Sequence, residues 1–281
     1  MKTMAVNRLS PARIRQFRGE VYDFFSRHGR SLPWRRRLNP YRVLVSEMML
    51  QQTQVSRVAE KYGPFLARFP DFSTLAGARL SDVLREWQGL GYNRRARSLH
   101  RAARAVVDEF GGKLPRDPAA LAGLPGIGAA TAGSIAAFAF NAPVVFVETN
   151  IRAVYIHCFF RDKSGVRDDQ IVPLVEQTLD RDNPRTWYSA LMDYGVELKK
   201  AHGNPSRRSA HHHVQSRFEG SDRQVRGRIL RALLDNQKTS FAVLRKETGC
   251  ESDRLGRILR DLVREGMVGR VKRSYTIDRE A

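Results

Sequence analysis

The feature that most constrains this chain is the stretch from Leu124 to Arg152, LPGIGAATAGSIAAFAFNAPVVFVETNIR. It opens with a glycine-rich turn that leads into a helix of small residues. Gly126 and Gly128 tolerate backbone angles that a side chain forbids. They also leave backbone N–H groups bare at a helix N-terminus, where a phosphate can bind. The stretch ends in a short apolar run that delivers Glu148. This pattern indicates chemistry at a nucleic-acid backbone.

Taken alone, the stretch leaves two interpretations open. Turns of this kind also suit DNA-binding proteins without enzymatic activity, and Glu148 would then only cap a helix that begins near Asn150. Catalysis needs a second carboxylate. Glu47 is the candidate, because it lies in an otherwise apolar segment of a helix expected over Tyr41–Val58. Burial makes an unpaired carboxylate costly and raises its pKa, which suits a general acid near neutral pH.

A solvent-facing position on an amphipathic helix is the alternative for Glu47. Directly after it, Gln51 and Gln52 offer amide groups. Amides can fill gaps in a base stack or bind base edges. They also suit a plain polar helix face, so the pattern alone does not separate the two uses.

The segment Gly89–Arg97, GLGYNRRAR, combines a glycine turn, an aromatic residue and three arginines. Tyr92 beside Arg94 and Arg95 is the combination that a base-displacing wedge requires, since phosphate contacts hold the strand while a ring enters the stack. A solvated, basic helix start is the alternative.

The chain has 281 residues, a formal net charge of +20 and a sequence pI of about 10.8. Such an imbalance favours a polyanionic partner, and double-stranded DNA is the default over an anionic membrane surface. No apolar run approaches the roughly 18 residues of a membrane span. The N-terminus lacks the apolar region of a secretion signal. Cys158 and Cys250 form no metal-ligand cluster. We therefore expect a cytoplasmic protein, nucleoid-associated if bacterial, that acts on DNA as a monomer without a membrane partner.

The remaining pattern is helical up to about residue 200. Ser10 followed by proline predicts a helix start, and Gly29 predicts its end. Further helices are expected over residues 60–110, and two more over 168–200. Asp193 is interpreted as structural, in an ion pair or a cap.

Residues 201–220 lack periodicity and are expected to form a linker. The run His211–His213 does not predict a metal site, because adjacent side chains point in different directions on any regular element. Residues 221–281 begin with a capping box at Ser221 and continue as three short helices and a two-stranded ribbon, with its turn near Lys272–Ser274. This is a winged-helix pattern, for which both DNA and protein contacts are plausible.

Five motifs, taken together, resemble the helix-hairpin-helix (HhH-GPD) DNA glycosylase superfamily, and most of all its adenine glycosylase branch, MutY. They occur in the family's order and close to its spacing. The motifs are LPWR (Leu32–Arg35), SEMMLQQTQV (Ser46–Val55), GLGY (Gly89–Tyr92), LPGIGAATAGSI (Leu124–Ile135) and MDYG (Met192–Gly195).

The resemblance implies an all-α, two-lobed glycosylase domain over residues 1–200 with its hairpin at 124–133. The linker at 201–220 and the winged-helix-like domain at 221–281, both inferred from the residues themselves, follow it. It places Glu47 at the family's acid/base glutamate, and Gln51 and Tyr92 where side chains enter the base stack. It also implies a monovalent cation at the hairpin 124–128. The residues that we assign to DNA contact are Gln51, Gln52, Tyr92, Arg94, Arg95, Leu124, Gly126, Ile127, Gly128, Ala129, Thr131 and Arg152.

Four features depart from the family pattern. The family's catalytic aspartate aligns with Glu148, whose side chain is one methylene longer. The lysine of lyase members is Ala130 here, so lyase activity is not expected. Residues 196–220 contain no cysteine, so no iron–sulfur cluster is expected. The C-terminal domain that reads 8-oxoguanine in MutY is replaced by the winged-helix-like segment.

The sequence therefore predicts a monofunctional DNA glycosylase of base excision repair, with Glu47 and Glu148 as catalytic residues and no cofactor. Adenine in a mismatch is the first candidate base, and uracil, thymine or a deaminated base is the alternative. A non-catalytic DNA-lesion-binding protein is the alternative of another class.

Overall fold

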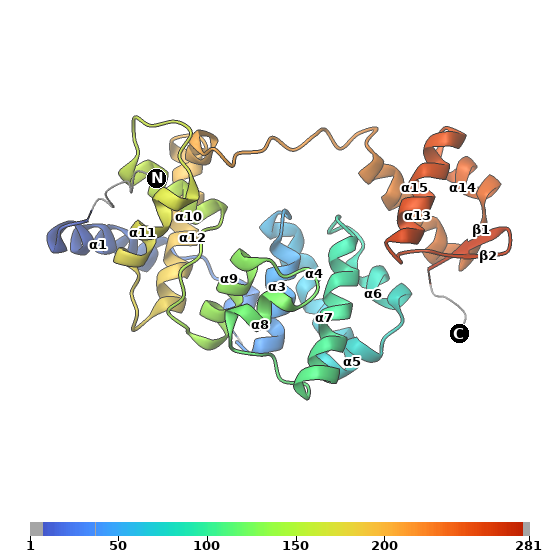
Figure 1. Cartoon of the computed structure of the whole chain (residues 1–281), viewed down its shortest axis with the longest axis horizontal. Helices are drawn as coiled ribbons and strands as arrows, with labels where there is room; N and C mark the ends of the chain where they lie inside the picture. Colours follow the sequence, from blue (N-terminus) through green and yellow to red (C-terminus); the bar gives the residue numbers. More distant parts are fainter. Residues whose placement is uncertain (1–7, 37, 278–281) are drawn as a thin grey trace, which may run out of the picture. The chain divides into compact units, whose positions relative to one another are not determined.

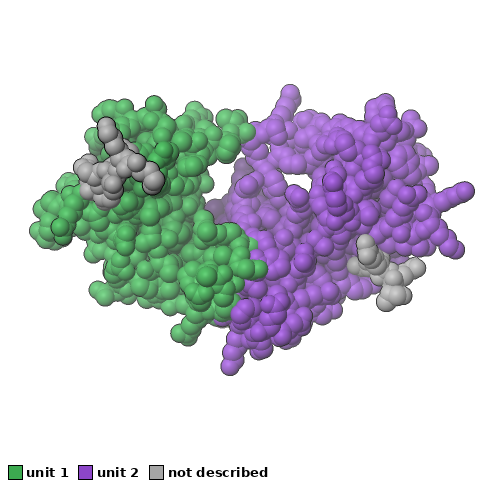
Figure 2. Space-filling model, in the orientation of Figure 1, with its two compact units in different colours: residues 1–47, 115–123, 127–214 green, residues 48–114, 124–126, 215–281 purple. Residues whose placement is uncertain are grey.

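The computed structural model describes residues 8–36 and 38–277. These residues form a mostly helical protein with one small sheet (Figure 1). The chain divides into two compact units, coloured separately in Figure 2. Unit 1 contains residues 1–47, 115–123 and 127–214, and unit 2 contains residues 48–114, 124–126 and 215–281. The all-helical class expected from the sequence is confirmed.

The helices up to the hairpin are α1 (Pro11–His28), α2 (Pro33–Arg36), α3 (Pro40–Leu50), α4 (Val55–Arg68), α5 (Phe72–Gly77), α6 (Leu80–Trp87), α7 (Arg94–Phe110) and α8 (Pro118–Gly123). After the hairpin come α9 (Ala129–Phe140), α10 (Thr149–Phe159), α11 (Asp168–Thr178), α12 (Pro184–Ala201) and the 3₁₀ turn η1 (Pro205–Arg208). The C-terminal elements are α13 (Asp222–Asn236), β1 (Lys238–Ser240), α14 (Phe241–Thr248), α15 (Ser252–Arg264), β2 (Gly269–Val271) and β3 (Ser274–Thr276).

Unit 1 is held together by an aromatic core between α1, α10 and α12. The Phe17 ring packs edge-on against Tyr155 and Trp187, with centroids 5.4 and 5.8 Å apart, and all three side chains are fully buried. Such pairs stabilise a core beyond the area that they bury. As predicted, Ser10 caps α1 by accepting a hydrogen bond from the backbone N–H of Arg13, and Gly29 is its C-cap.

The helix α12 approaches the start of α10 more closely than any side chain at the contact would allow. Gly195 provides the space: a Cβ atom built on it lies 2.5 Å from the backbone oxygen of Asn150 and 2.9 Å from its Cβ. This contact brings the last turns of α12 beside the residues that follow Glu148. Figure 1 shows α12 running alongside α10.

The chain after α12 is packed in its first half, where the sequence predicts only a linker. The Arg208 guanidinium donates to the carbonyl oxygens of Phe160 at 2.7 Å, Ile156 at 3.4 Å and Arg161. These carbonyls lie at the end of α10 and just beyond it, where helix oxygens lack intrahelical partners. At the other end of α10, buried Ser206 donates to the Thr149 oxygen at 2.9 Å. The segment therefore ties both ends of α10.

The single helix expected over Tyr41–Val58 is wrong: it is two helices, α3 and α4, separated by a turn. Arg95 ends α3 by donating through Nη1 to the carbonyls of Met48 and Met49, both at 2.8 Å. Gln52 then turns the chain with a φ of +54°, a value that side chains rarely adopt. The reversal depends on a residue from α7, so the local sequence could not reveal it.

The C-terminal segment confirms the winged-helix pattern and adds one strand. Ser221 caps α13 by accepting from the N–H of Gln224, and the ribbon β2–β3 turns at Lys272 and Arg273. The sheet has the order β1–β3–β2, all antiparallel. The sequence analysis missed β1, because three residues are too few for a periodic signal.

Among the helices that the structure describes, none is long and apolar enough to cross a membrane.

Gly195→Ala is expected to lower the free energy of unfolding by about 1–3 kcal/mol, the usual cost of forcing an extra methyl group into a packed contact. Gly19→Ala is the matched control, since this exposed glycine of α1 has nothing within 4 Å of a built Cβ. We expect the control to be neutral or stabilising by up to about 1 kcal/mol. Urea denaturation of both variants checks the prediction, and equal stability would contradict it.

Candidate functional site

Glu47 lies in the last half of α3 and is half-buried among apolar neighbours. The hydroxyl of buried Ser134, on α9, donates to its Oε2 at 2.5 Å. Removal from water raises the pKa of Glu47 to about 7, although the Ser134 hydrogen bond opposes the shift. The negative charge of Glu148 raises this pKa further, and the charge of Arg35 lowers it. The carboxyl group is thus poised to exchange a proton near neutral pH.

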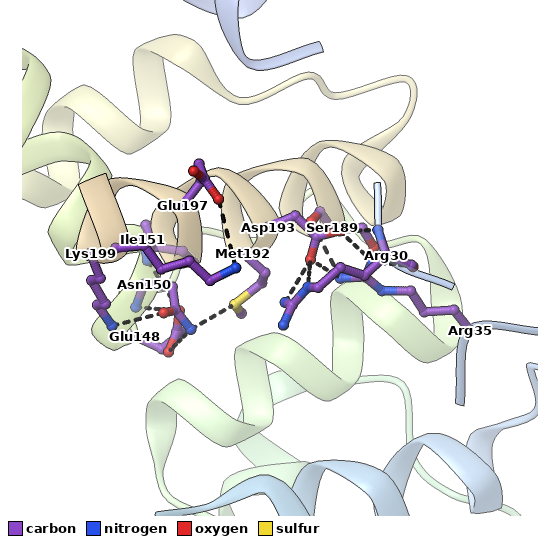
Figure 3. Close-up of polar contacts among 11 residues, drawn as sticks. Arg30, Arg35, Glu148, Asn150, Ile151, Ser189, Met192, Asp193, Glu197 and Lys199 are labelled. Atoms are coloured by element: carbon purple, nitrogen blue, oxygen red, sulfur yellow. Dashed lines mark hydrogen bonds and ion pairs between the residues drawn. The ribbon is translucent and has the colours of Figure 1, made fainter. Parts of the chain in front are cut away.

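Glu148 is the N-cap of α10, as the alternative interpretation of this residue expected. Its Oε1 accepts hydrogen bonds from the backbone N–H groups of Asn150 at 2.6 Å and Ile151 at 3.1 Å. Its Oε2 lies 3.5 Å from the side-chain Nδ2 of Asn150 (Figure 3). Burial raises the pKa of Glu148, while the Ile151 hydrogen bond and the positive charge of Lys199 act against the shift. Capping therefore uses mainly one carboxylate oxygen.

Glu47 and Glu148 both belong to unit 1, and the charge of Glu148 contributes to the raised pKa of Glu47. Their surroundings differ, which is the condition for giving two carboxyl groups different tasks. Glu47 has a neutral hydroxyl as its hydrogen-bond partner, whereas Glu148 accepts N–H groups at the positive end of a helix. The first arrangement suits a proton donor, and in the second the N–H groups favour the charged carboxylate against the burial that raises its pKa.

Asp193 anchors the loop before α3 to α12. This carboxylate is 3% exposed, and it accepts hydrogen bonds from the Arg30 backbone N–H at 2.8 Å and from both guanidinium groups of Arg30 and Arg35. Burial pulls the pKa of Asp193 up, but the hydrogen bonds from Arg35 and Arg30 outweigh it and the pKa is lowered. Figure 3 shows Asp193 on the same helix that carries Lys199, with Arg30 and Arg35 beside it. Its structural role was predicted from the sequence.

The hairpin Leu124–Gly128 is anchored by its apolar side chains. Leu124 and Ile127 are each 4% exposed, so any contact that they make with DNA involves the backbone only. Gly126 has a φ of +80°, and a Cβ built on it would lie 2.5 Å from the Cβ of Ser98, so only glycine fits. Gly128 and Ala129 are exposed at the start of α9. The first N–H groups of a helix have no intrahelical partners, so this exposed helix end is suited to an anion such as phosphate.

Arg95 takes a role different from the DNA contact expected of it. Its side chain is buried, and its two Nη atoms donate to the carbonyls of Met48, Met49, Leu90 and Gly91 and to the hydroxyl of Thr53. Burial lowers the pKa of this guanidinium to about 10, so it stays positively charged at neutral pH. Both Nη atoms are thus committed to the protein, and the remaining Nε–H is buried without a partner among the described residues, so the guanidinium is not available to a phosphate. Arg95 instead fixes the turn at 51–54 and the turn at 89–92.

Tyr92 lies in a strained backbone conformation, with a φ of +46°. Two guanidinium carbons, those of Arg95 and Arg223, each lie 5.6 Å from its ring centroid. Arg223 of α13 also donates to its hydroxyl at 2.7 Å. The C-terminal segment thus contributes a side chain to the environment of Tyr92, which the sequence analysis did not foresee.

Two other arginines predicted to contact DNA have acidic partners. Arg94 is 69% exposed and lies 3.3 Å from Glu265, so it is accessible. Arg152 pairs with Asp168 through two hydrogen bonds of 2.7 Å and is 15% exposed. Arg152 therefore links α10 to α11 and is poorly placed for a phosphate.

The amides and the hairpin helix complete the predicted set. Gln51 lies in unit 2 with its Nε2 3.4 Å from the carbonyl of Gly126, and Gln52 is exposed. Thr131 accepts the Ser134 hydroxyl through its backbone oxygen at 2.9 Å. Sequence reasoning missed Ser134, Lys199 and Arg223, because nothing in a linear pattern shows which distant side chains meet. No group of three potential metal ligands occurs in the ranges 8–36 and 38–277.

A profile of the HhH-GPD superfamily of base excision DNA repair proteins matches residues 45–171. This range contains both carboxylates and the hairpin. The adenine DNA glycosylase of Mycolicibacterium smegmatis is 36% identical over 236 residues, which cover 77% of this chain and 80% of that relative. The chain therefore belongs to the HhH-GPD superfamily of base excision DNA repair proteins.

Within that superfamily the chain is most similar to the MutY-like branch. The adenine DNA glycosylase of Mycobacterium tuberculosis is 34% identical, with 80% of this chain and 79% of the relative covered. The human adenine DNA glycosylase is 37% identical over 66% of this chain but only 36% of its own length. The matched part of this chain thus covers most of the length of the two mycobacterial relatives and about a third of the length of the human relative.

Solved structures share the fold. A thermostable thymine-DNA glycosylase aligns with a TM-score of 0.62 and 23% identity, covering 69% of this chain and 91% of that chain. An endonuclease III trapped on DNA aligns with a TM-score of 0.55 and 19% identity, covering 69% and 88%. At these identities the likeness concerns the fold alone.

Glu47→Gln is expected to become more stable relative to the wild type as pH rises from 5 to 8. The pKa of Glu47 is near 4.5 in an unfolded chain and about 7 in the folded protein. The folded state therefore holds a proton that the unfolded state releases, and stability is lost as pH rises through this interval. The total is about 3 kcal/mol, which the amide variant does not lose. Chemical denaturation at both pH values measures it, and a pH-independent difference would refute it.

Arg95→Met and Arg94→Met are expected to differ sharply in their free energy of unfolding. Loss of Arg95 leaves several carbonyls without donors and lowers the free energy of unfolding by about 3 kcal/mol or more. Arg94 forms only an exposed ion pair, so its replacement changes stability by about 1 kcal/mol at most. Thermal melts of both variants test the assignment, which fails if the two behave alike.

Proposed function

We propose that this protein is a DNA glycosylase that hydrolyses the N-glycosidic bond of a flipped-out base, with adenine in a mismatch as its substrate. The observation that carries the proposal is the pair of half-buried carboxyl groups in unit 1, of which Glu47 has a pKa of about 7. Membership of the HhH-GPD superfamily supports it, and so do the names of the bacterial and human relatives.

In this proposal Glu47 supplies a proton to the departing purine. Ser134 has one hydroxyl proton and two acceptors within reach, Glu47 at 2.5 Å and the Thr131 carbonyl at 2.9 Å. A protonated Glu47 can donate to Ser134, which then donates to Thr131. An ionised Glu47 accepts from Ser134 instead. Both protonation states are therefore accommodated without moving the backbone, as a group that gives and regains a proton requires.

Glu148 stabilises the positive charge that develops on the sugar as the bond breaks. Its carboxylate is held by backbone N–H groups before the reaction begins, so little reorganisation is needed at the transition state. The capping bonds engage Oε1 at 2.6 and 3.1 Å, whereas Oε2 has only the 3.5 Å contact with Asn150. This Oε2 is the atom that we assign to the sugar.

The DNA is held by its phosphates and opened by Tyr92 and Gln51. The exposed hairpin residues Gly128 and Ala129 bind a phosphate, together with a monovalent cation at 124–128. Arg95 keeps the two turns that carry Gln51 and Tyr92 in place. With a net charge of +20, affinity for duplex DNA falls steeply as salt rises. We propose that the protein binds as a monomer.

Lyase activity is absent in this proposal. A lyase forms a covalent imine through an amine in the hairpin helix, and the residue at that position is Ala130, which is exposed. Hydrolysis without an amine nucleophile leaves an intact strand with an abasic site. The active protein needs no iron–sulfur cluster in our proposal, since η1 ties α10 by hydrogen bonds.

The experiment is an excision assay on duplexes that carry A opposite 8-oxoguanine, A opposite G, uracil opposite G, T opposite G, and hypoxanthine opposite T. Strand cleavage is measured with and without alkali. We expect adenine release that needs alkali for cleavage, and a loss of about 100-fold or more in Glu47→Gln and Glu148→Gln.

Three other results would each contradict one part of the proposal. Release of uracil or thymine would change the substrate and reduce Glu47 to positioning water, since a pyrimidine needs protonation less. Cleavage without alkali would reveal lyase activity. Tight binding without release of any base would leave a non-catalytic lesion-binding protein.

A further inference from the structure

An amine lies behind Glu148, on the face of α12 that packs against α10. Lys199 is half-buried, and its Nζ donates to the side-chain Oδ1 of Asn150 at 2.8 Å (Figure 3). The backbone N–H of the same Asn150 donates to Glu148 at 2.6 Å, and its Nδ2 lies 3.5 Å from the other carboxylate oxygen. Asn150 thus contacts both Lys199 and Glu148.

The ammonium group determines which way the amide of Asn150 faces. A protonated lysine only donates hydrogen bonds, so the amide must present its oxygen to Lys199. The NH₂ group is then left pointing to Glu148. Without the ammonium, the amide oxygen loses the donor that holds it away from Glu148, and only the carboxylate itself keeps the NH₂ group facing it. Lys199 therefore fixes a donor on Glu148 although it does not touch the carboxylate itself.

The neighbouring lysine provides a contrast. Lys200 is exposed and lies 3.8 Å from Glu197, one turn away on the same helix. An exposed pair of this kind contributes little to stability. Lys199, in contrast, gives up hydration to reach an uncharged amide, and burial lowers its pKa while the charge of Glu148 raises it. Partial burial of an ammonium group against a neutral partner is unfavourable unless its charge also interacts with a nearby negative charge.

We propose that Lys199 is a positioning residue of the glycosylase reaction, which acts through Asn150 to orient Glu148 and keep it ionised. This inference rests on the proposed function of Glu148. It concerns a position outside the motifs by which the sequence resembles its superfamily.

Two cations of unit 1 act on the charge of Glu148, and one carboxyl group is affected by it. Lys199 on α12 and Arg152 on α10 both favour the charged carboxylate, and Arg152 is already paired with Asp168. Glu47 on α3 is a negative neighbour whose own pKa is raised by Glu148. Burial raises the pKa of Glu148 against the hydrogen bonds and the two cations. Removing Lys199 therefore makes Glu148 take up a proton at higher pH.

The test compares Lys199→Met with Lys199→Arg, and uses Lys200→Met as the matched control. Single-turnover rates on the preferred duplex are measured from pH 5.5 to 9. In Lys199→Met the acidic limb of the profile moves to higher pH, so that the loss of rate relative to the wild type is larger at pH 6 than at pH 8.5. Lys199→Arg restores the wild-type limb, and Lys200→Met leaves it unchanged.

A second measurement does not need activity. The difference in free energy of unfolding between a parent and its Glu148→Gln variant changes with pH around the folded pKa of Glu148. In the Lys199→Met background this change moves to higher pH. If no duplex is cleaved, the proposed function fails while this titration still decides whether Lys199 acts on Glu148.

A structural role alone predicts a different result. Lys199→Met would then lose the same factor of rate at every pH, together with a lower melting temperature and an unmoved titration. That outcome, or a profile of Lys199→Met that coincides with that of Lys200→Met, overturns the proposal.

Discussion

The close approach of α12 to the first turn of α10 is the constraint on which the rest of unit 1 depends. Gly195 makes the approach possible because no Cβ fits against the backbone of Asn150. Once the helices are this close, α12 presents Asp193 to the loop before α3 and Lys199 to Asn150. A purely apolar contact would give similar packing but no polar groups beside Glu148. One glycine thus determines the surroundings of a carboxylate on another helix.

In unit 2 the local structure depends on a buried charged side chain, Arg95, rather than on a glycine. Two turns, at 51–54 and 89–92, have little regular structure of their own, and each contains a residue with positive φ. Arg95 reaches both turns from α7 and satisfies carbonyls that α3 leaves open at its end. A buried guanidinium suits this task, because its five N–H donors are arranged in a rigid plane. The strain at Gln52 and Tyr92 is therefore held by one side chain.

The sequence was sufficient for features that depend on local chemistry. The cap at Ser10, the glycine hairpin, the structural role of Asp193 and the winged-helix pattern all follow from residues close together in the chain. It was also sufficient to predict that Glu47 is partly buried and has a raised pKa, since a carboxylate in an apolar helix segment is recognisable without any knowledge of its neighbours.

It was not sufficient where the outcome depends on residues far apart. The end of α3 is set by Arg95, which lies 46 and 47 positions beyond the carbonyls that it binds. An arginine beside an aromatic looks the same in sequence whether it binds phosphates or carbonyls. Lys199 and Lys200 are adjacent and chemically identical, and only the packing of α12 decides that Lys199 forms the hydrogen bond to Asn150. Glu148 combines both cases, since the capping seen in the structure and the chemistry that we propose use the same carboxylate.

The contact at Gly195 also affects how variants of this protein should be classified. Because α12 is in direct contact with the backbone beside Glu148, a shift of this helix moves the carboxylate by a similar amount, and a displacement of about 1 Å can reduce a rate on the order of a hundredfold. With the role that we propose for Glu148, substitutions on the buried side of α12 are expected to reduce activity as strongly as the loss of that residue, while the protein still folds. Surveys that rank harmful changes by distance from the carboxylates will underestimate this helix.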